Sequence, residues 1–248
     1  MAEKHFYEQK KYTQEYLFPY FQKYIPNFHS KKILEVGCAE GGLLEVMREL
    51  SIYAVGLEIS AERAAVATQK DPSLKLVVGD IMDPRLPEIL NEKFDFIIMR
   101  EVIEHIPNKN AAFDNLNALL NSKGYLFMSF PPKRSPFAGH QQIGKSIIKA
   151  VPYLHVLPKS ILKKIASAMG ESEGYIDEIK LHFSTGCTIK EFERQSLSRS
   201  MFPVKKEYYF FRPIYATRFG LPTVKLPGIP ILREYISFGC ETLLQKSL

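Results

Sequence analysis

The segment that most limits the fold is ILEVGCAEGG, residues 33–42, in which a short apolar strand runs directly into a glycine-rich turn and then into a helix. Glycine is needed where a backbone turns sharply and comes close to a ligand. A strand, a glycine turn and a helix in this order are typical of the first βα unit of a doubly wound parallel sheet, where nucleotide cofactors bind.

Strand-like and helix-like segments alternate around this turn, which predicts an α/β fold with a parallel sheet. An aromatic amphipathic helix, interrupted near Pro19, precedes the first strand, and Ser60 is the expected N-cap of a later helix. Strands are predicted at 32–36, 53–57, 74–78, 94–99 and 124–130, and helices at 12–25, 41–50, 61–70 and 108–120.

The regular pattern ends at Pro131-Pro132, and residues 131–185 are interpreted as a lid or substrate insertion that contains a helix at 160–169. A helix at 188–196 and a strand at 204–211 follow, while residues 233–244 read equally well as a strand or a short helix. We therefore predict a single domain over residues 1–248, with residues 1–30 as a helical cover.

Length and composition support a folded domain, because 248 residues with 46% apolar content suffice for one large core. No apolar run approaches the roughly 18 residues of a membrane span, and the charged N-terminus predicts no secretory signal. Cys38, Cys187 and Cys240 lie far apart, which argues against a disulfide scaffold and a cysteine zinc site and favours the cytoplasm. No metal ligands are assigned, and the net charge of +6 is only weak evidence for an acidic partner.

Charge distinguishes two interpretations of the glycine turn. Gly37, Ala39 and Gly42 match a relaxed G-x-G-x-x-G pattern, so an NAD-linked oxidoreductase is one alternative. Glu35 before the turn and Glu40 within it would repel a diphosphate by about 1 kcal/mol or more at about 4 Å. S-adenosylmethionine carries a sulfonium and an ammonium and no phosphate, so the two acids favour this ligand.

Two further acids follow the next strands. Glu58 ends the second predicted strand, at the distance from the glycine turn where a ribose diol is usually hydrogen-bonded. Asp80 follows the third strand, where an adenine edge would lie. Because ligands of such sheets bind at the carboxyl ends of the strands, acids at three successive strand ends predict a cofactor site rather than solvated side chains.

These residues resemble a known family. The run from Glu35 to Gly42 looks like motif I, E-x-G-x-G-x-G, of class I S-adenosylmethionine-dependent methyltransferases, with Ala39 where the middle glycine is usual. Residues 94–99 with the continuation Glu101-Val-Ile-Glu-His105 are similar to the family's fourth strand and its "LEHI" segment, and residues 121–130 resemble its fifth strand. The resemblance covers roughly residues 30–130 with every motif in order.

The resemblance implies a Rossmann-like, doubly wound α/β sheet of seven strands in the order 3-2-1-4-5-7-6, with strand 7 antiparallel. The last two strands would lie in 204–211 and 233–244. It also implies that S-adenosylmethionine, and S-adenosylhomocysteine as its product, is held by Tyr12, Glu35, Gly37, Cys38, Ala39, Gly41, Glu58, Ile59, Asp80, Ile81, Met82, Arg100 and Glu101. In this superfamily the N-terminal segment often reaches the methionine carboxylate, so Tyr7, Lys11 and Tyr12 are candidates, with simple packing as the alternative.

Histidines are the candidate bases, because methyl transfer to a hydroxyl group needs a proton acceptor with a pKa near neutral. His140, just beyond the fifth strand, is the leading candidate, and His182 is the second. His105 is a third candidate, for which a structural hydrogen bond is the preferred alternative. The other histidines, His5, His29 and His155, are interpreted as ordinary surface or partly packed residues.

The expected acceptor is a small molecule or a lipid-like molecule, methylated at oxygen. An RNA or DNA substrate is disfavoured, because the fourth strand ends in Met99-Arg100-Glu101-Val102 rather than in an N-P-P-Y-like loop. The apolar stretch 147–154 and the lysines and rings of 205–211 suggest peripheral membrane contact, against the alternative that 208–211 is a core strand. A cofactor-binding protein without transfer activity is a further alternative, and the oligomeric state is not predicted.

Overall fold

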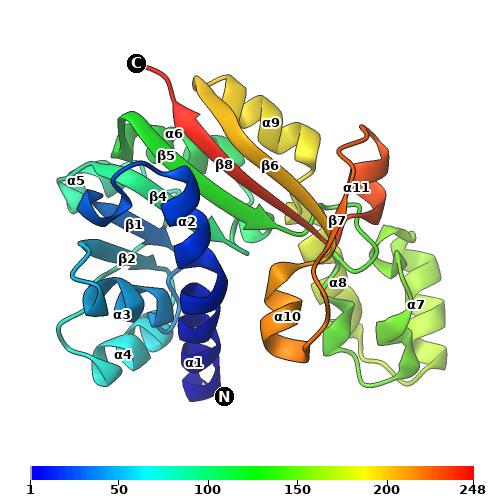
Figure 1. Cartoon of the computed structure of the whole chain (residues 1–248). Coiled ribbons are helices and arrows are strands. Elements are labelled where there is room, and N and C mark those ends of the chain that lie inside the picture. Colours follow the sequence, from blue (N-terminus) through cyan, green and yellow to red (C-terminus); the bar gives the residue numbers. More distant parts are fainter. Residues whose placement is uncertain (1) are drawn as a thin grey trace.

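The computed structural model describes residues 2–248 and has three layers, with helices on both faces of one sheet (Figure 1). The sheet of the described residues has eight strands in the order β3-β2-β1-β4-β5-β8-β6-β7. The strands are β1 (Ile33–Val36), β2 (Ala54–Glu58), β3 (Lys75–Val78), β4 (Phe94–Arg100), β5 (Leu120–Phe130), β6 (Met201–Phe211), β7 (Val224–Leu226) and β8 (Gly239–Lys246).

The predicted strand order is confirmed, with β8 in the place of strand 7. β8 pairs antiparallel with both β5 and β6, whereas β1 to β5 are parallel to one another. The strand count differs by one, because the short β7 adds to the edge of the sheet beside β6. It has only three residues and lies in a proline- and glycine-rich loop, so the sequence carries no strand pattern there.

The N-terminal helical segment is longer than predicted and is not broken at Pro19. It runs through α1 (Ala2–Tyr12), a π-helical segment (Thr13–Leu17) and α2 (Phe18–Tyr24). Pro19 lies in the first turn of α2, where a missing N–H group costs little. The π-helical turn joins the two α-helices without a loop.

The remaining helices lie close to their predicted ranges where a range was predicted. Ser60 caps α4 by accepting the N–H of Arg63, as predicted. Residues 233–244 combine both alternatives, since α11 ends at Ile236 and β8 begins at Gly239. The helices are α3 (Gly42–Glu49), α4 (Ala61–Lys70), α5 (Leu86–Leu90), α6 (Lys109–Leu119), α7 (Lys159–Ala168), α8 (Glu173–Thr185), α9 (Ile189–Leu197), α10 (Pro213–Phe219) and α11 (Leu232–Ile236); α5, α8 and α10 were not predicted.

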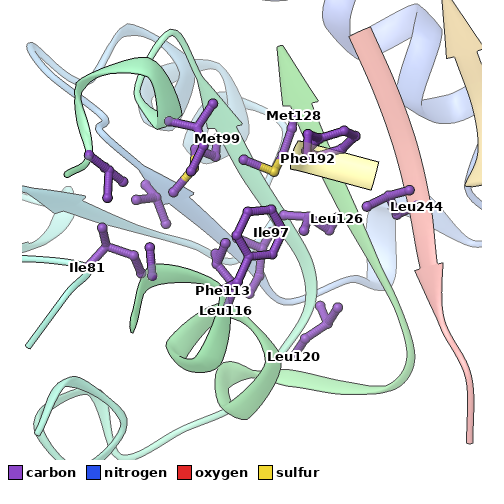
Figure 2. Packing of buried hydrophobic residues seen from close by; sticks show 14 of the residues in the cluster. Ile81, Ile97, Met99, Phe113, Leu116, Leu120, Leu126, Met128, Phe192 and Leu244 are labelled. Atoms are coloured by element: carbon purple, nitrogen blue, oxygen red, sulfur yellow. The ribbon is translucent and has the colours of Figure 1, made fainter. Parts of the chain in front are cut away.

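The central strands are buried on both faces, as apolar parallel strands require. On one face, Ile97 and Met99 of β4 pack against Phe113 of α6 and Phe192 of α9 (Figure 2). On the other face, side chains from the N-terminal helices, α3 and the alternate strand positions form a second core. The two cores hold the carboxyl ends of β1, β2 and β4 in fixed positions.

Residues 131–185 contain a small core of their own, built on Leu162 and Ala166 of α7 and Ile176 and Ile179 of α8. In Figure 1 this part lies at one end of the molecule, beside α10. Across residues 2–248, none of the helices has the length and apolar character needed to cross a membrane.

Candidate active site

The glycine turn after β1 has the left-handed backbone that its sequence requires. The φ angles are +75° at Gly37, +54° at Ala39 and +80° at Gly41, a region that glycine occupies at little cost. A Cβ atom on Gly37 would lie 2.3 Å from Cγ2 of Val102. Ala39 adopts this conformation despite its methyl group, which explains why a glycine is more usual there.

Glu58 links this turn to the next strand. Its buried carboxylate, at the end of β2, accepts the N–H of Ala39 at 2.8 Å and the N–H of Ser60 at 2.9 Å. The side chain predicted to bind a ribose therefore also orders the glycine turn.

A cavity of about 920 Å³ opens beside the turn, within the range of roughly 300–1,000 Å³ common to small-molecule sites. It lies at the carboxyl ends of the neighbouring strands β1 and β4. From β1 the chain continues to β2 and β3 on one side of the sheet, and from β4 it continues to β5 on the other side. Ligands of open α/β sheets bind at such a point. Seven of the predicted cofactor residues line this cavity: Tyr12, Gly37, Ala39, Glu58, Ile59, Arg100 and Glu101.

The other predicted cofactor residues lie close by but are not part of the lining. Gly41 forms the N-cap of α3, Asp80 accepts the N–H of Met82 at 2.8 Å, and Ile81 and Met82 belong to or pack on the core. Cys38 is fully buried, with its Sγ near Gly56 of β2. Glu35 is also buried, beneath the turn.

The N-terminal helix and α4 add lining residues that the sequence did not reveal. His5 and Gln9 come from α1, and Arg63 comes from the first turn of α4. Gln9 accepts the N–H of Gly42 at 3.1 Å. The position of Tyr12 agrees with the expected N-terminal cover, whereas Tyr7 is 56% exposed and outside the lining.

The far side of the cavity is basic and aromatic. Its side chains come from α10, its flanks and the segment after β5, which the motifs of residues 30–130 do not reach. They include Phe137, Lys149, Arg212, Tyr215, Arg218 and Phe219.

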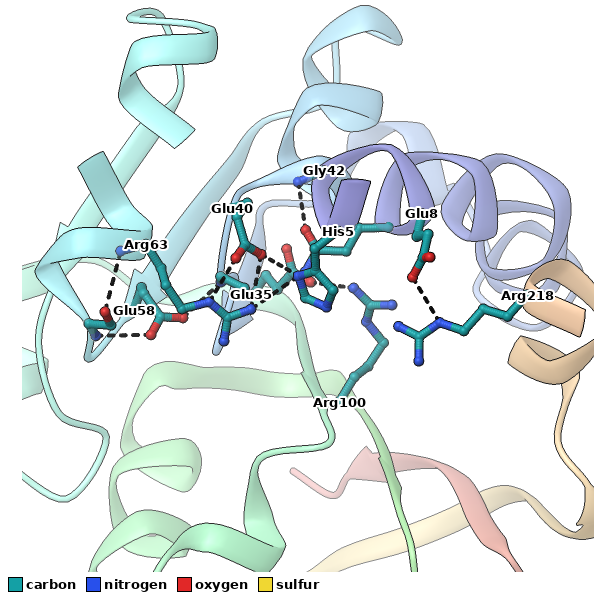
Figure 3. Close-up of polar contacts among 12 residues, drawn as sticks. His5, Glu8, Glu35, Glu40, Gly42, Glu58, Arg63, Arg100 and Arg218 are labelled. Carbon is teal, nitrogen blue, oxygen red and sulfur yellow. Dashed lines mark hydrogen bonds and ion pairs between the residues drawn. The ribbon is translucent and has the colours of Figure 1, made fainter. Parts of the chain in front are cut away.

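The acids of the turn are paired within the protein (Figure 3). Arg100 donates to Glu35 at 2.8 Å, and Glu40 binds both Arg63, at 2.9 Å, and His5. Glu101 at the mouth of the cavity is held by Arg212 at 2.7 Å.

This pairing corrects the electrostatic prediction. Glu35 and Glu40 do not form an uncompensated negative rim, because each carries its own cation. The cavity lining as a whole has more basic than acidic side chains. What remains of the prediction, among the described residues of the lining, is one carboxylate without a salt bridge, that of Glu58.

Burial and pairing act differently on the two acids. Burial raises the pKa of Glu35 above its usual value, and the charge of Arg100 offsets this only in part. Burial also acts to raise the pKa of Glu40, but hydrogen bonds from Arg63 and His5 outweigh it, so this pKa lies below its usual value.

The three candidate catalytic histidines lie together. His105 ends the 3₁₀ turn Ile103–His105 after β4, His140 lies in the segment after β5, and His182 is on α8. The rings of His140 and His182 are stacked with their centroids 4.1 Å apart. The ring centroid of His105 lies 5.0 Å from that of His140 and 5.1 Å from that of His182. Of the three, His105 lines the cavity.

The environment of His105 and His140 favours neutral rings. Burial, followed by the neighbouring His182 and His105, lowers the pKa of His140 to about 4, and burial with His182 lowers the pKa of His105. The other histidines differ from their interpretation in two cases. His155 is completely buried, and His5 is part of the cavity, because the longer α1 brings it there.

The sequence was compared with known proteins. A family model described as "Methyltransferase domain" matches residues 8–170. The ubiquinone biosynthesis O-methyltransferase of Glaesserella parasuis is 33% identical over 106 residues, 40% of this chain and 44% of that protein. The mitochondrial ubiquinone biosynthesis O-methyltransferase of Candida albicans is 32% identical over 176 residues, 66% of this chain and 52% of that protein. The matches thus span about half the length of these curated relatives.

Solved structures agree on the fold. Magnesium protoporphyrin IX methyltransferase from Synechocystis PCC 6803, crystallised with bound SAH, aligns with a TM-score of 0.56 over 97% of this chain and 84% of that chain, at 13% identity. At this identity the likeness concerns the fold alone. Together with the family model, which matches more than half of the sequence, it confirms the resemblance drawn from the motifs: the chain belongs to the methyltransferase domain family, with the class I, S-adenosylmethionine-dependent fold.

Proposed function

We propose that this chain transfers the methyl group of S-adenosylmethionine to an oxygen atom of a small-molecule or lipid-like acceptor. The observation that carries the proposal is the cavity beside the glycine turn, which joins Gly37, Ala39 and Glu58 to a histidine, His105. The names of the related O-methyltransferases support oxygen as the methylated atom.

The residues of the cavity fit the methyl donor. An ionised carboxylate has about four acceptor positions, so Glu58 can bind a ribose diol in addition to its two backbone N–H groups. Tyr12 and Arg100 lie on the side of the N-terminal helix and would hold the methionine portion. Asp80, Ile81 and Met82, at the end of β3, would border the adenine.

When bound, the donor supplies an electrophilic methyl group, whose bond to sulfur breaks as its bond to the acceptor oxygen forms. The chain contributes alignment and the exclusion of water, which are the main requirements of such a displacement. The N-terminal helices cover one side of the cavity, and residues 131–185 would close the other as a lid. His105, which lines the cavity, would take the hydroxyl proton, with His140 and His182 next to it.

The far side of the cavity supports a more specific acceptor. Its aromatic rings favour a flat apolar group. Arg212 and Arg218 already bind Glu101 and Glu8, so Lys149 is the lining cation on which a negative charge of the same molecule would depend. We therefore propose an aromatic acceptor with an acidic substituent; the residues that would meet it are Phe137, Lys149, Arg212, Tyr215, Arg218 and Phe219.

Surface exposure supports a lipid-like acceptor and peripheral membrane contact. Ile161 and Ile165 of α7 and Met169 at its C-cap lie four residues apart and are 46%, 39% and 42% exposed, and Ile147, in the segment before α7, is 73% exposed. For residues 208–211 the burial of Tyr208 and Tyr209 in the sheet favours the alternative, a core strand, over membrane contact. The membrane contact would therefore be made by residues 131–185, in a cell compartment that keeps the three buried cysteines reduced, such as the cytoplasm.

Binding of S-adenosylhomocysteine, measured by isothermal titration calorimetry, tests the cofactor site. We expect micromolar or tighter binding, and a loss of about 1–3 kcal/mol in Glu58→Ala, because a hydrogen bond to a charged group is removed. Glu62→Gln, on the exposed side of α4, is the matched control. Unchanged affinity in Glu58→Ala would reject the ribose role, and binding without methyl transfer to any of a broad panel of phenols and acids would favour the non-catalytic alternative.

A further inference from the structure

The histidine cluster described above has a geometry that the sequence did not predict. One ligand atom from each of His105, His140 and His182 lies within 4.8 Å of the other two. The three residues are separated by more than thirty positions in each case, so no spacing motif marks them. Only the packing of α8 and of the segment after β5 against the end of β4 brings them together.

We propose that His105, His140 and His182 form a binding site for one divalent transition-metal ion of the kind that prefers imidazole, such as Zn²⁺. Three histidines with a free coordination position are the ligand set of several catalytic zinc sites. The preference of imidazole nitrogen for zinc, iron, copper and nickel over magnesium and calcium fixes the class of ion.

The surroundings of the rings favour ligation over a purely structural role. Burial, the neighbouring rings and the carboxylate of Glu101 act on His105 and His140, and among residues 2–248 no side-chain hydrogen bond is found that fixes either ring. Glu178, on the same helix as His182, places a carboxylate oxygen 3.5 Å from Nε2 of that ring. Carboxylates beside ligating histidines are a usual feature of metal sites, where they orient the ring.

The distances require only a small contraction. A tetrahedral ion with bonds of about 2.0–2.1 Å brings its ligand nitrogens to roughly 3.3 Å from one another. The present upper limit is 4.8 Å, and the rings of His140 and His182, stacked with their planes 24° apart, must tilt toward each other so that their nitrogens converge on one ion. Rotations about the side-chain bonds of exposed or half-buried residues can close this difference.

A role for the ion follows from the position of the cluster, and this part rests on the proposed function. His105 lines the cavity, whereas His140 and His182 lie outside its lining, and a shared ion would link them to an acceptor there. An ion held by all three would sit at the edge of the cavity with positions open to an acceptor oxygen. With the ion bound, His105 would be a ligand and no longer the base. A metal–oxygen bond would form, the hydroxyl proton would pass to water at a lowered pKa, and the oxygen would become the nucleophile.

Titration of the metal-free, untagged full-length protein with Zn²⁺ tests the site, with Co²⁺ as a spectroscopic probe. We expect one ion per chain and visible absorption bands typical of tetrahedral Co²⁺. His140→Ala and His182→Ala should each weaken the affinity at least about tenfold, since even the loss of an outer partner has effects of this size. His29→Ala, an exposed histidine on another surface, should bind as the wild type does.

The proposal is overturned if the wild type binds no Zn²⁺ or if His140→Ala and His182→Ala bind it as tightly as the wild type. Circular dichroism shows whether each variant is folded, and His182→Gln replaces His182→Ala if the latter is not. S-adenosylhomocysteine is titrated into the same metal-free preparation. Binding of this nucleoside without binding of Zn²⁺ rejects the metal site alone, whereas the reverse result rejects the proposed function alone.

Discussion

Glu241 is an acid buried where the sheet meets the N-terminal helices. It lies on β8 and accepts the hydroxyl of Tyr16 at 2.7 Å. Burial raises its pKa to about 7, although the bond from Tyr16 and the charge of Arg212 oppose the shift. The native protein therefore keeps the proton of Glu241 at pH values where the unfolded chain has lost it.

The sign of the pH dependence follows from this difference. Between the ordinary pKa of about 4.5 and the native value of about 7, the native state binds more protons than the unfolded state, so the free energy of unfolding falls as the pH rises. Glu241→Gln keeps an oxygen for the hydroxyl of Tyr16 and removes the charge. We expect this variant to exceed the wild type by on the order of 2–3 kcal/mol at pH 8 and to approach it at pH 5.

Urea denaturation at several pH values measures this effect. Glu62→Gln, which removes an exposed carboxylate, should follow the wild-type profile. A constant difference between Glu241→Gln and the wild type from pH 5 to pH 8 would contradict the raised pKa.

Single residues also show where sequence reasoning stops. The sequence motifs predicted Tyr12, Gly37 and Glu58 as cofactor-binding residues, and all three line the cavity. The same pattern could not show that Glu35 and Glu40 are neutralised, because their partners Arg100 and Arg63 lie on other elements. A carboxylate and its cation meet only through tertiary packing, for which a linear spacing gives no signal.

At the scale of elements, the packing of α1 on α3 is the contact on which the shape of the cavity depends. A Cβ atom on Gly42, the first residue of α3, would lie 2.5 Å from the carbonyl oxygen of Phe6 and 2.6 Å from Cβ of Gln9. Backbone atoms of α1 cannot yield to such a contact as a flexible side chain would. Gly42 therefore permits the close approach that places His5, Gln9 and Tyr12 in the cavity.

Gly42→Ala is expected to displace α1. We predict a loss of about 1–3 kcal/mol in the free energy of unfolding, the usual cost of overpacking, and weaker binding of S-adenosylhomocysteine. Gly174→Ala, in α8, is the control, because its nearest neighbour would be 3.7 Å away. Denaturation and calorimetry on both variants test this, and wild-type affinity in Gly42→Ala would show that α1 does not shape the binding site.

Elements with strong periodicity were predicted well, and those without it were not. The helix at 61–70 was predicted with its cap, because Ser60 and the helical spacing of the apolar residues indicate the same start. Helix α8 was not predicted as a helix, since its buried residues Tyr175, Ile176 and Ile179 face only the small core of residues 131–185. A weak apolar stripe of this kind resembles a loop in a linear sequence.

At the scale of the whole molecule, residues 131–185 lie at one end (Figure 1) and carry nine of the exposed large apolar side chains. If this end contacts membranes, the protein should sediment with vesicles that contain anionic lipid at low salt, and less so at high salt. The double variant Ile161→Glu/Ile165→Glu should lose most of this binding. Ile89→Glu, at an equally exposed position on α5, should retain it. Wild-type protein that stays in the supernatant at low salt would end the proposal of membrane contact.

The strand and turn motifs of residues 33–130 predicted a doubly wound parallel sheet, and the order of its strands came from the resemblance to a family. The second half was predicted only through the resemblance to a family. Neither β6 nor β8 carries a motif, and the histidine cluster depends on loops whose course no periodicity describes.

The position of β8 between β5 and β6 has a consequence for how the protein forms. Within the described part of the chain, β6 pairs only with β8 and the three-residue β7. While a ribosome is still adding residues 212–238, the completed β6 cannot yet join the sheet, because the free edge of β5 pairs with β8, which has not been made. The last third of the chain must therefore wait, and the edge of β5 stays open to other nascent chains until Gly239–Lys246 arrives to close it.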